Sequence, residues 1–340
     1  MRKKAFCFGA LIAINFLSFF HKMTKLDNRH PGQFQNGDMG IPFMLENTHI
    51  HGILVRLGQQ GRTIIDRQQI PPVIGGHLAE CLALSAAIYG SQKDGAILSF
   101  ALNGTDKGDV RQLLADVRQT QKLDSKIEGK EMMALRACAM LNDGKASALG
   151  QGLLDLLGEE AYLTLTLEPL NPRAEPSQAI IALVAQSLEQ AVDDYFHQSA
   201  QQMAMCRLSH SFNHEGYKAS CLLLKQLPLT HDHEREKAQD DWRRASLLLQ
   251  SLKNTELNDA QLGHDALLYR LFHEDGVRLF HPKYYVDECT CSRQRMMNML
   301  MGIDKQARKD LIKPQSGLYE VTCQFCNQTH KFHESDLTIH

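Results

Sequence analysis

The segments Cys289-Thr-Cys291 and Cys323-Gln-Phe-Cys326 decide how the last part of this 340-residue chain folds. Each segment holds two thiols close together along the chain, and 31 residues (292–322) separate the two pairs. Four thiolates in two close pairs match the tetrahedral coordination that Zn²⁺ prefers. Only one intervening loop has to close, and that entropic cost grows slowly with loop length. We predict one Zn²⁺ per chain, held by Cys289, Cys291, Cys323 and Cys326, although the same thiols could also form short-range disulfides and so act as a redox switch.

The overall composition is that of a folded protein without an unusual charge. The chain is 43% hydrophobic and 22% charged, and its net charge is −2, so no basic excess points to a nucleic-acid partner. The length favours two domains. Nine cysteines are too few and too unevenly spread for a disulfide scaffold. Because Cys81, Cys138, Cys206 and Cys221 stand alone among apolar neighbours, we predict that they are core residues.

The N-terminus carries a basic and then an apolar segment. Arg2, Lys3 and Lys4 precede an apolar run over 5–20, as in a secretory signal. No Ala-x-Ala-like cleavage site follows, and the run is shorter than the ~20 residues of a spanning helix. We favour Met23 as the true start and expect a cytoplasmic protein, with a signal peptide or membrane anchor as the alternative. We assign 1–37 to an N-terminal extension.

Residues 38–229 read as an α+β domain with a mixed sheet and packed helices. Leu163, Leu165 and Leu167 alternate with polar or amphipathic residues, which indicates a half-buried strand. Apolar residues at helical spacing predict helices over 73–89 and 187–198. Residues 178–184 are apolar without a decisive period and could form a strand or a helix. Further strands are predicted over 52–57, 96–102, 110–117 and 218–225.

The last third of the chain divides into a charged linker and the cysteine module. Residues 230–286 begin with a highly charged stretch and then show two helical segments, over 242–252 and 265–272, so we predict a helical, weakly packed, metastable linker. The zinc module is assigned to 287–340. Between the cysteine pairs we expect one helix over 292–311, whose methionines pack inside the module, and residues 327–332 read as the returning strand of a hairpin.

The cysteine segments and four others resemble one protein family. Cys289-Thr-Cys-Ser-Arg293 and Glu320-Val-Thr-Cys-Gln-Phe-Cys-Asn327 are similar to the zinc centre of the bacterial redox-regulated holdases, the 33 kDa chaperonin (heat shock protein 33) family. Leu268-Tyr-Arg-Leu-Phe-His-Glu274, Tyr162-Leu-Thr-Leu-Thr-Leu-Glu-Pro169 and Asp194-Tyr-Phe196 extend the resemblance, which covers about 45–337. The apolar N-terminal extension and Pro176-Ser-Gln-Ala179 depart from the family pattern, which leaves localisation and one turn open.

The resemblance implies a chaperone rather than an enzyme. It implies a cytoplasmic, ATP-independent holdase that binds unfolding client proteins under oxidative stress and is inactive while reduced and zinc-bound. Oxidation would form Cys289–Cys291 and Cys323–Cys326 disulfides, because the nearest thiol partners are expected within each pair, and would release zinc and unfold the linker. It also implies a homodimer in the oxidised state and no nucleotide. No Gly-x-x-x-x-Gly-Lys-Ser/Thr phosphate loop occurs in the sequence.

Two other functions fit part of the same pattern. A nucleic-acid-binding zinc ribbon would use the basic residues between the pairs, although Asp304 and Asp310 interrupt them and such charges usually form a solvated helix face. A thiol–disulfide oxidoreductase would use Cys323 and Cys326, a motif that normally opens a helix after a strand. Histidine ligands are not expected, because four thiolates already fill a tetrahedral shell. The histidines considered were His231, His233, His330 and His333.

Overall fold

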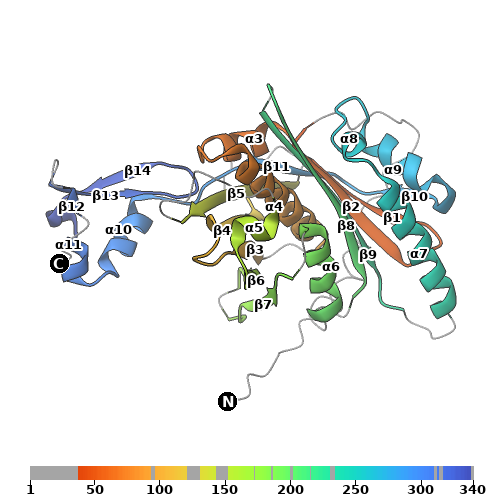
Figure 1. Ribbon diagram of the computed structural model, residues 1–340, viewed down its shortest axis with the longest axis horizontal. Helices are drawn as coiled ribbons and strands as arrows, with labels where there is room; N and C mark the ends of the chain where they lie inside the picture. Colours follow the sequence, from red (N-terminus) through yellow and green to blue (C-terminus); the bar gives the residue numbers. More distant parts are fainter. Residues whose placement is uncertain are drawn as a thin grey trace, which may run out of the picture. The chain divides into compact units, whose positions relative to one another are not determined.

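The computed structural model describes residues 37–92, 96–120, 131–142, 152–171, 173–184, 187–199, 202–214, 216–229, 234–309, 312–313 and 317–337. The chain divides into two compact units, one ending at Asp287 and the other beginning at Glu288. The expectations about the apolar N-terminal run, Met23, His231 and His233 lie outside the described residues. The architecture is α+β, as predicted, with a large sheet and helices in the first unit (Figure 1).

The described strands of the first unit form one mixed sheet. Its order is β7-β6-β3-β4-β5-β11-β1-β2-β9-β8, and β10 adds to β1. All neighbours pair antiparallel except β11 and β5, which pair parallel. The strands are β1 (Met39–Leu45), β2 (Ile50–Leu57), β3 (Ala96–Asn103), β4 (Val110–Gln119), β5 (Glu131–Leu141), β6 (Tyr162–Pro169), β7 (Ser177–Ala182), β8 (Ala204–Asn213), β9 (Gly216–Gln226), β10 (Val277–Leu279) and β11 (Lys283–Asp287).

The strand patterns follow from which faces of the sheet are covered. In β6, Leu163 and Leu165 are buried while Tyr162 is exposed, so the predicted half-buried strand is confirmed. In β2 every residue is buried, because packed layers cover both of its faces. The segment over 178–184, which the sequence left open, forms strand β7.

One face of the sheet carries the main core around α4 (Pro72–Gly90). Pro72 occupies the first turn, where its missing N–H costs nothing, and the helix is apolar on all sides because nearly all of it is buried. Gly75 and Gly76 let it approach the sheet closely, since a Cβ on Gly76 would lie 2.4 Å from His210 Nε2. This helix is long and apolar enough to cross a membrane, yet 83% of its apolar window is buried in the protein.

Other helices flank the same core. α3 (Gln59–Asp66) begins where the Asp38 carboxylate accepts hydrogen bonds from the N–H groups of Gly58, Gln60 and Gly61, at 2.8–3.1 Å. α5 (Leu153–Leu157) buries three leucines, and α6 (Leu188–Ser199) buries Leu188, Val192, Tyr195 and Phe196 as predicted. Cys81, Cys138, Cys206 and Cys221 are all buried, which confirms their assignment to the interior.

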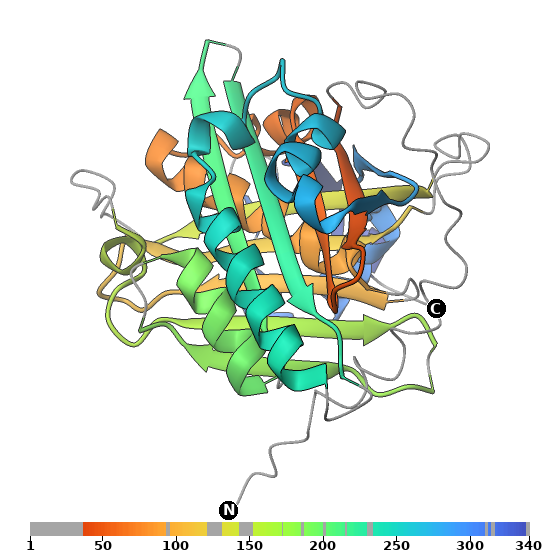
Figure 2. The same cartoon turned by 90° about the vertical axis from the view of Figure 1, so that its right-hand side faces the viewer.

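The second core lies on the opposite face of β1, β2 and β9 and corrects one prediction. α7 (Arg235–Ser251), α8 (Asn254–Leu257), α9 (His264–Phe272) and η3 (His273–Asp275) cover these strands (Figure 2). The helices expected over 242–252 and 265–272 are therefore present. The segment is not weakly packed, however, because Trp242, Leu249, Leu267 and Phe272 are buried against Phe43 and Leu54. It also supplies strands β10 and β11 to the sheet, which the sequence did not reveal.

The second unit is a small three-stranded module. Strand order is β12-β13-β14, and the returning strand predicted over 327–332 is confirmed by the β13–β14 hairpin. The single helix expected over 292–311 is instead two helices, because α10 ends at Met301 and the chain turns at Gly302 before α11 starts. Its elements are α10 (Arg293–Met301), α11 (Lys305–Lys309), β12 (Ile312–Lys313), β13 (Leu318–Thr322), β14 (Thr329–Phe332) and η4 (Glu334–Leu337).

The module has a very small apolar core. Among its described residues, the buried cluster consists of Leu300, Tyr319, Phe332 and Leu337. Met296, Met297 and Met301 pack against this cluster, so the expectation that methionines pack inside the module is confirmed for these three. Met299 is 49% exposed and does not belong to it. Four buried side chains provide little hydrophobic stabilisation for a folded unit.

Candidate metal centre

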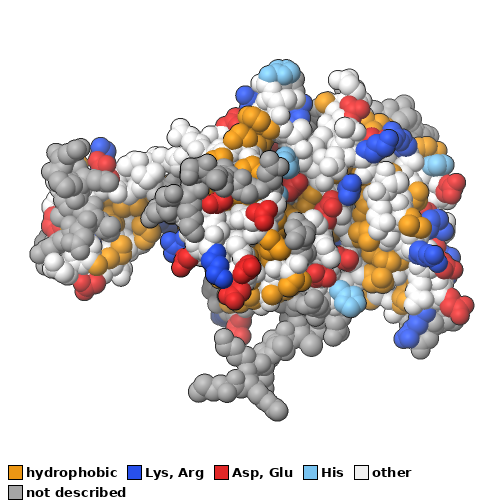
Figure 3. Space-filling model, in the orientation of Figure 1, with side chains coloured by type: hydrophobic (Ala, Val, Ile, Leu, Met, Phe, Trp, Pro, Cys, Tyr) orange, Lys and Arg blue, Asp and Glu red, His pale blue; other side chains and the backbone are white. Residues whose placement is uncertain are grey.

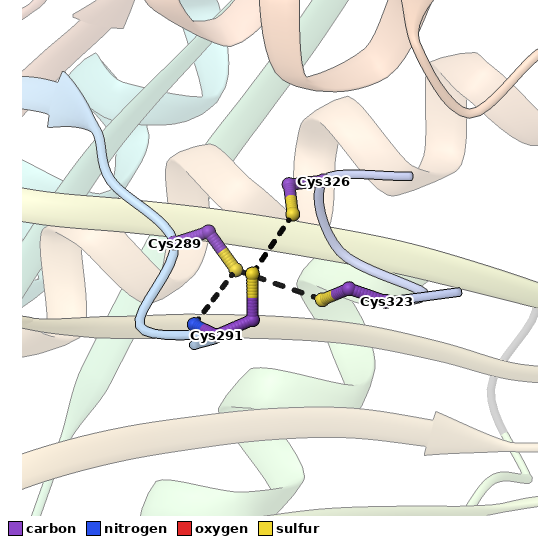
Figure 4. Close-up of side chains that lie close together, drawn as sticks. All are labelled: Cys289, Cys291, Cys323 and Cys326. Carbon is purple, nitrogen blue, oxygen red and sulfur yellow. Dashed lines mark hydrogen bonds between the residues drawn. The ribbon is translucent and has the colours of Figure 1, made fainter. Parts of the chain in front are cut away.

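Four cysteine sulfurs converge in the second unit. Cys289, Cys291, Cys323 and Cys326 each offer a sulfur, and the four atoms lie within 4.8 Å of one another (Figure 4). The first pair lies on the segment between β11 and α10, and the second lies on the turn between β13 and β14. The structure therefore brings together all four residues that the sequence nominated, and this group could hold a metal ion.

The turn that carries the second pair is held by backbone hydrogen bonds. Cys323 N donates to Gln328 O at 3.0 Å, and Asn327 N donates to Cys323 O at 2.8 Å. Asn327 has φ 56°, a left-handed conformation that asparagine tolerates better than most residues. These bonds bend the chain so that both thiols of the Cys-Gln-Phe-Cys segment point to one side.

The first pair is fixed by the start of α10. Cys291 N donates to Cys289 Sγ at 3.4 Å, and the Ser292 side chain caps α10 by accepting a hydrogen bond from Arg295 N at 3.2 Å. Arg295 also donates from its guanidinium to Thr290 O at 2.9 Å. The helix start therefore positions the Cys-Thr-Cys segment through its backbone.

The electrostatics of the four thiols call for a cation. Burial raises the pKa of Cys291, and hydrogen bonds with Cys326 and Cys289 raise it further. Burial also raises the pKa of Cys326, although the N–H of Gln328 opposes this. For Cys323, burial is outweighed by the N–H groups of Cys326 and Phe325, so its pKa is lowered. Because neighbouring thiolates repel one another, the four can ionise together only when a cation balances their charge.

The closest thiol contacts differ from the expected ones. Cys291 Sγ lies 3.2 Å from Cys326 Sγ, and Cys289 Sγ lies 3.7 Å from Cys323 Sγ. Both contacts cross between the two pairs, so the expectation that the nearest partners lie within a pair is wrong for the folded module. The reason is geometric, because four ligands arranged around one point face each other across it.

Sequence reasoning did not find the side chain that borders the thiols. Gln328 Oε1 lies 3.8 Å from Cys291 Sγ, and the Gln328 carbonyl accepts the hydrogen bond from Cys323 N. Only its place two residues after the last cysteine could have indicated this. Of the histidines near the module, His330 and His333 are absent from the described metal-ligand group.

Comparison with known proteins gives the family. A family model described as Hsp33 protein matches residues 38–333. The chain belongs to the Hsp33 family. The match spans both units, from the first strand of the sheet to the hairpin that carries Cys323 and Cys326. Membership of this family supports a chaperone function.

Individual relatives agree with this assignment. A 33 kDa chaperonin of Pseudomonas paraeruginosa is 28% identical over 302 residues, which cover 89% of this chain and 94% of the relative. A 33 kDa chaperonin of Pseudomonas putida is 30% identical over 296 residues, covering 87% and 90%. The crystal structure of a 33 kDa chaperonin from Thermotoga maritima matches with a TM-score of 0.68 at 16% identity, covering 88% of this chain and 96% of that one, which shows the shared fold.

The two other functions weighed for the cysteine module receive no support from its geometry. Cys323 and Cys326 lie in a hairpin turn, whereas a reactive Cys-x-x-Cys pair usually starts a helix. Arg293 stacks its guanidinium 4.4 Å from the Phe332 ring centre and pairs with Asp336 at 2.8 Å. This arginine is therefore engaged within the module, as expected of a structural contact.

Proposed function

We propose that this protein is a redox-regulated, ATP-independent holdase that is inactive while reduced and zinc-bound. The observation that carries the proposal is the convergence of the four sulfurs within 4.8 Å, in a chain of a chaperone family. Zinc is favoured over other metals because four thiolates in a small closed site suit its tetrahedral coordination. Cys289, Cys291, Cys323 and Cys326 would hold one ion per chain.

The switch works because a thiolate is the form of cysteine that oxidants attack. A peroxide oxidises one thiolate to a sulfenic acid and is itself reduced to water. A second thiol then displaces the hydroxyl group as a second water, so that two thiols and one peroxide give one disulfide and two waters. Two such reactions consume all four ligands and release the metal.

The disulfide pairing remains a proposal, because the folded contacts cross between the pairs. Once the metal leaves, the module loses its fold, and the chance of two thiols meeting then depends on their separation along the chain. Cys289–Cys291 and Cys323–Cys326 close the shortest loops. If the thiols react before the module unfolds, Cys289–Cys323 and Cys291–Cys326 form instead, so disulfide mapping distinguishes the two orders of events.

Metal loss would unfold the second unit. A structural Zn²⁺ contributes roughly 10–16 kcal/mol of apparent binding free energy in small zinc peptides. The apolar cluster of Leu300, Tyr319, Phe332 and Leu337 is too small to replace that contribution. Strand β11 ends at Asp287, two residues before Cys289, so the unfolded module leaves the end of β11 untethered along the chain.

Release of 234–286 from the sheet would expose a client-binding surface. On this face, Ile41, Phe43, Leu54, Leu222 and Leu224 are fully buried beneath the segment. Uncovering them creates a continuous apolar area on β1, β2 and β9 that suits unfolding proteins. Hydrophobic side chains already gather between α6 and α7 on the face drawn in Figure 3. Leu247 on α7 and Met203 before β8 are among the exposed ones, at 58% and 43%.

The other features of the proposed machine follow from this mechanism. Clients are unfolding polypeptides bound through apolar surface, and no nucleotide is consumed because metal release provides the driving event. We propose a homodimer in the oxidised state, since the uncovered apolar face also fits a second copy. We propose a cytoplasmic location, because a reducing compartment keeps the four thiols on zinc until oxidative stress.

A peroxide titration tests the proposal. Reduced protein is treated with peroxide at raised temperature, released zinc is read with a chromogenic chelator, and the same samples are tested for suppression of client aggregation. We expect about one zinc per chain to leave as client protection appears, and a thiol reductant with added zinc to reverse both. Zinc release without client protection would refute the switch and leave the cysteines as a structural clip.

A further inference from the structure

Arg56 on β2 is a buried cation whose recorded partners are all backbone carbonyls. Its guanidinium donates to Leu257 O at 2.9 Å, to Glu256 O at 3.2 Å and to Leu262 O. The residue is only 8% exposed. Burial lowers its pKa to about 10, opposed by the nearby Asp259 carboxylate, so it stays charged at neutral pH. The three carbonyls therefore replace the water that would solvate this charge.

The three carbonyls belong to a segment that cannot satisfy them itself. α8 has four residues, and Glu256 and Leu257 lie in its last turn, where helix carbonyls lack intrahelical donors. A cation at this position also interacts favourably with the negative end of the helix dipole. Arg56 thus caps α8 from the sheet, over a sequence separation of about 200 residues.

The strand register places two more polar side chains beside Arg56. Arg56 lies opposite Ser220 on β9, and Ser220 lies opposite Ser209 on β8, so the three form a row across neighbouring strands. Asn258 bridges the two serines: Ser220 Oγ donates to its Oδ1 at 2.7 Å, and its Nδ2 donates to Ser209 Oγ at 2.7 Å. The row contacts one continuous stretch, 254–262.

We propose that Arg56 is the positioning residue that holds the stretch 254–262 on the sheet and sets how readily it leaves. Because Arg56 binds backbone carbonyls, it recognises the folded conformation of α8 and the following turn rather than their side chains. The stretch is held independently of the metal, since all of these contacts lie within the first unit. The regulatory consequence rests on the proposed holdase function, whereas the docking itself does not.

The substitution Arg56→Met tests the docking directly. Methionine keeps much of the side-chain volume but leaves three carbonyls without their donor in the docked state, which favours undocking. In reduced, zinc-bound protein we expect amide exchange in 252–263 to become at least tenfold faster, with exchange in 288–337 and bound zinc unchanged. Arg56→Lys keeps the charge and one donor group, and we expect it to restore part of the protection.

The matched control is Arg270→Met. Arg270 also contacts Glu256, but through the exposed carboxylate rather than the backbone. We expect little change in exchange, because exposed ion pairs contribute little to stability. If Arg56→Met fails to fold, Asn258→Ala removes the bridge to the serines and should accelerate exchange over the same stretch.

Two results separate this inference from the proposed function. Unchanged or slower exchange over 252–263 in folded Arg56→Met protein, or equal acceleration in the Arg270→Met control, would overturn the docking role, whatever the holdase assay shows. Faster exchange together with client protection by the reduced, zinc-bound variant supports both. Faster exchange without client protection after peroxide treatment upholds the docking role and contradicts the holdase.

Discussion

His51 on β2 lies directly opposite Lys225 on β9, and both side chains are buried although each can carry a positive charge. Lys225 Nζ donates to Ser91 Oγ at 2.8 Å, just past the end of α4, and lies 4.7 Å from the centre of the Phe196 ring. Burial lowers the pKa of Lys225 to about 7. Burial also lowers the pKa of His51 well below its ordinary value, and the charge of Lys225 lowers it further.

Replacing Lys225 should change how stability depends on pH. The folded pKa is lowered from 10.5 to about 7, so the unfolded chain binds more protons between these values and stability rises with pH across that window. We expect Lys225→Met to flatten this rise and to stabilise the protein near pH 7, by at most about 5 kcal/mol. Urea denaturation at pH 7 and pH 9.5, followed by circular dichroism, measures it. An undiminished pH slope in the variant would contradict the buried-lysine account.

The acid limb of stability should depend on Glu80. This carboxylate lies 2.8 Å from His210 Nδ1 and 3.4 Å from His77 Nδ1. Although burial raises its pKa, hydrogen bonds from His210 and His77 outweigh it, and the pKa falls to about 2. Its stabilisation is present above the unfolded value of 4.5 and is lost as pH falls from 4.5 to 2.

The expected loss in Glu80→Gln is up to about 3 kcal/mol at pH 6, with no difference from the parent protein remaining near pH 2. Thermal unfolding at several pH values provides the comparison. Equal destabilisation at pH 6 and pH 2.5 would show that glutamine disrupts packing rather than an ion pair.

Removing the metal should unfold the second unit and leave the sheet intact. We expect a strong chelator under reducing conditions to abolish protection of amides over 288–337 while α4 keeps its protection. Cys326→Ser should have the same effect without a chelator. Cys138→Ala, which removes a buried thiol outside the metal-ligand group, is the control and should keep one metal per chain. Retained protection in the metal-free protein would mean that the small apolar core folds unaided.

Weakening the contact between Phe43 and Phe272 should release the covering segment without oxidation. The two rings are stacked with centroids 6.0 Å apart, and neither residue is exposed. Removing a buried phenylalanine side chain costs about 3–5 kcal/mol. We expect Phe272→Ala to protect clients while reduced and zinc-bound, whereas Tyr269→Ala, on the exposed side of α9, should behave as the parent protein does. Aggregation assays in the presence of a thiol reductant compare the two.

Local patterns predicted the elements whose cause is local. The alternation in β6, the apolar stripe of α6 and the long apolar run of α4 each report burial by neighbours, and each element is present. The metal group was also predictable, because two close cysteine pairs can meet around one ion with a single loop between them. The thiol contacts across the pairs were not, since they depend on how the two turns face each other.

Long-range pairing escaped prediction. β11 joins the sheet parallel to β5, over a sequence separation of about 150 residues, and β1 and β8 likewise gain their strand partners only in the folded sheet. Lys283, buried within β11, even argues against a central strand. Such pairings depend on topology, which local periodicity does not contain.

The packing of α7 was misjudged because its charges satisfy one another. Asp241 accepts from Lys237 at 2.6 Å and from Arg244 at 3.3 Å, and Arg244 also pairs with Asp275. The charged stretch therefore looks solvated in the sequence. On the other side of the same helix, an apolar stripe is buried against the sheet. Its buried residues include Ala238, Trp242, Ala245 and Leu249.

The most direct measurement follows Trp242 during oxidation. It is the single tryptophan of the chain, lies on α7 and is only 7% exposed, so its emission reports whether the covering segment stays on the sheet. Zinc release and Trp242 emission are recorded together as peroxide is added. The account predicts that the emission shifts to the red as zinc leaves and returns when reductant and zinc are restored. Complete zinc release with unchanged emission would contradict it, because the segment would then stay docked without the metal.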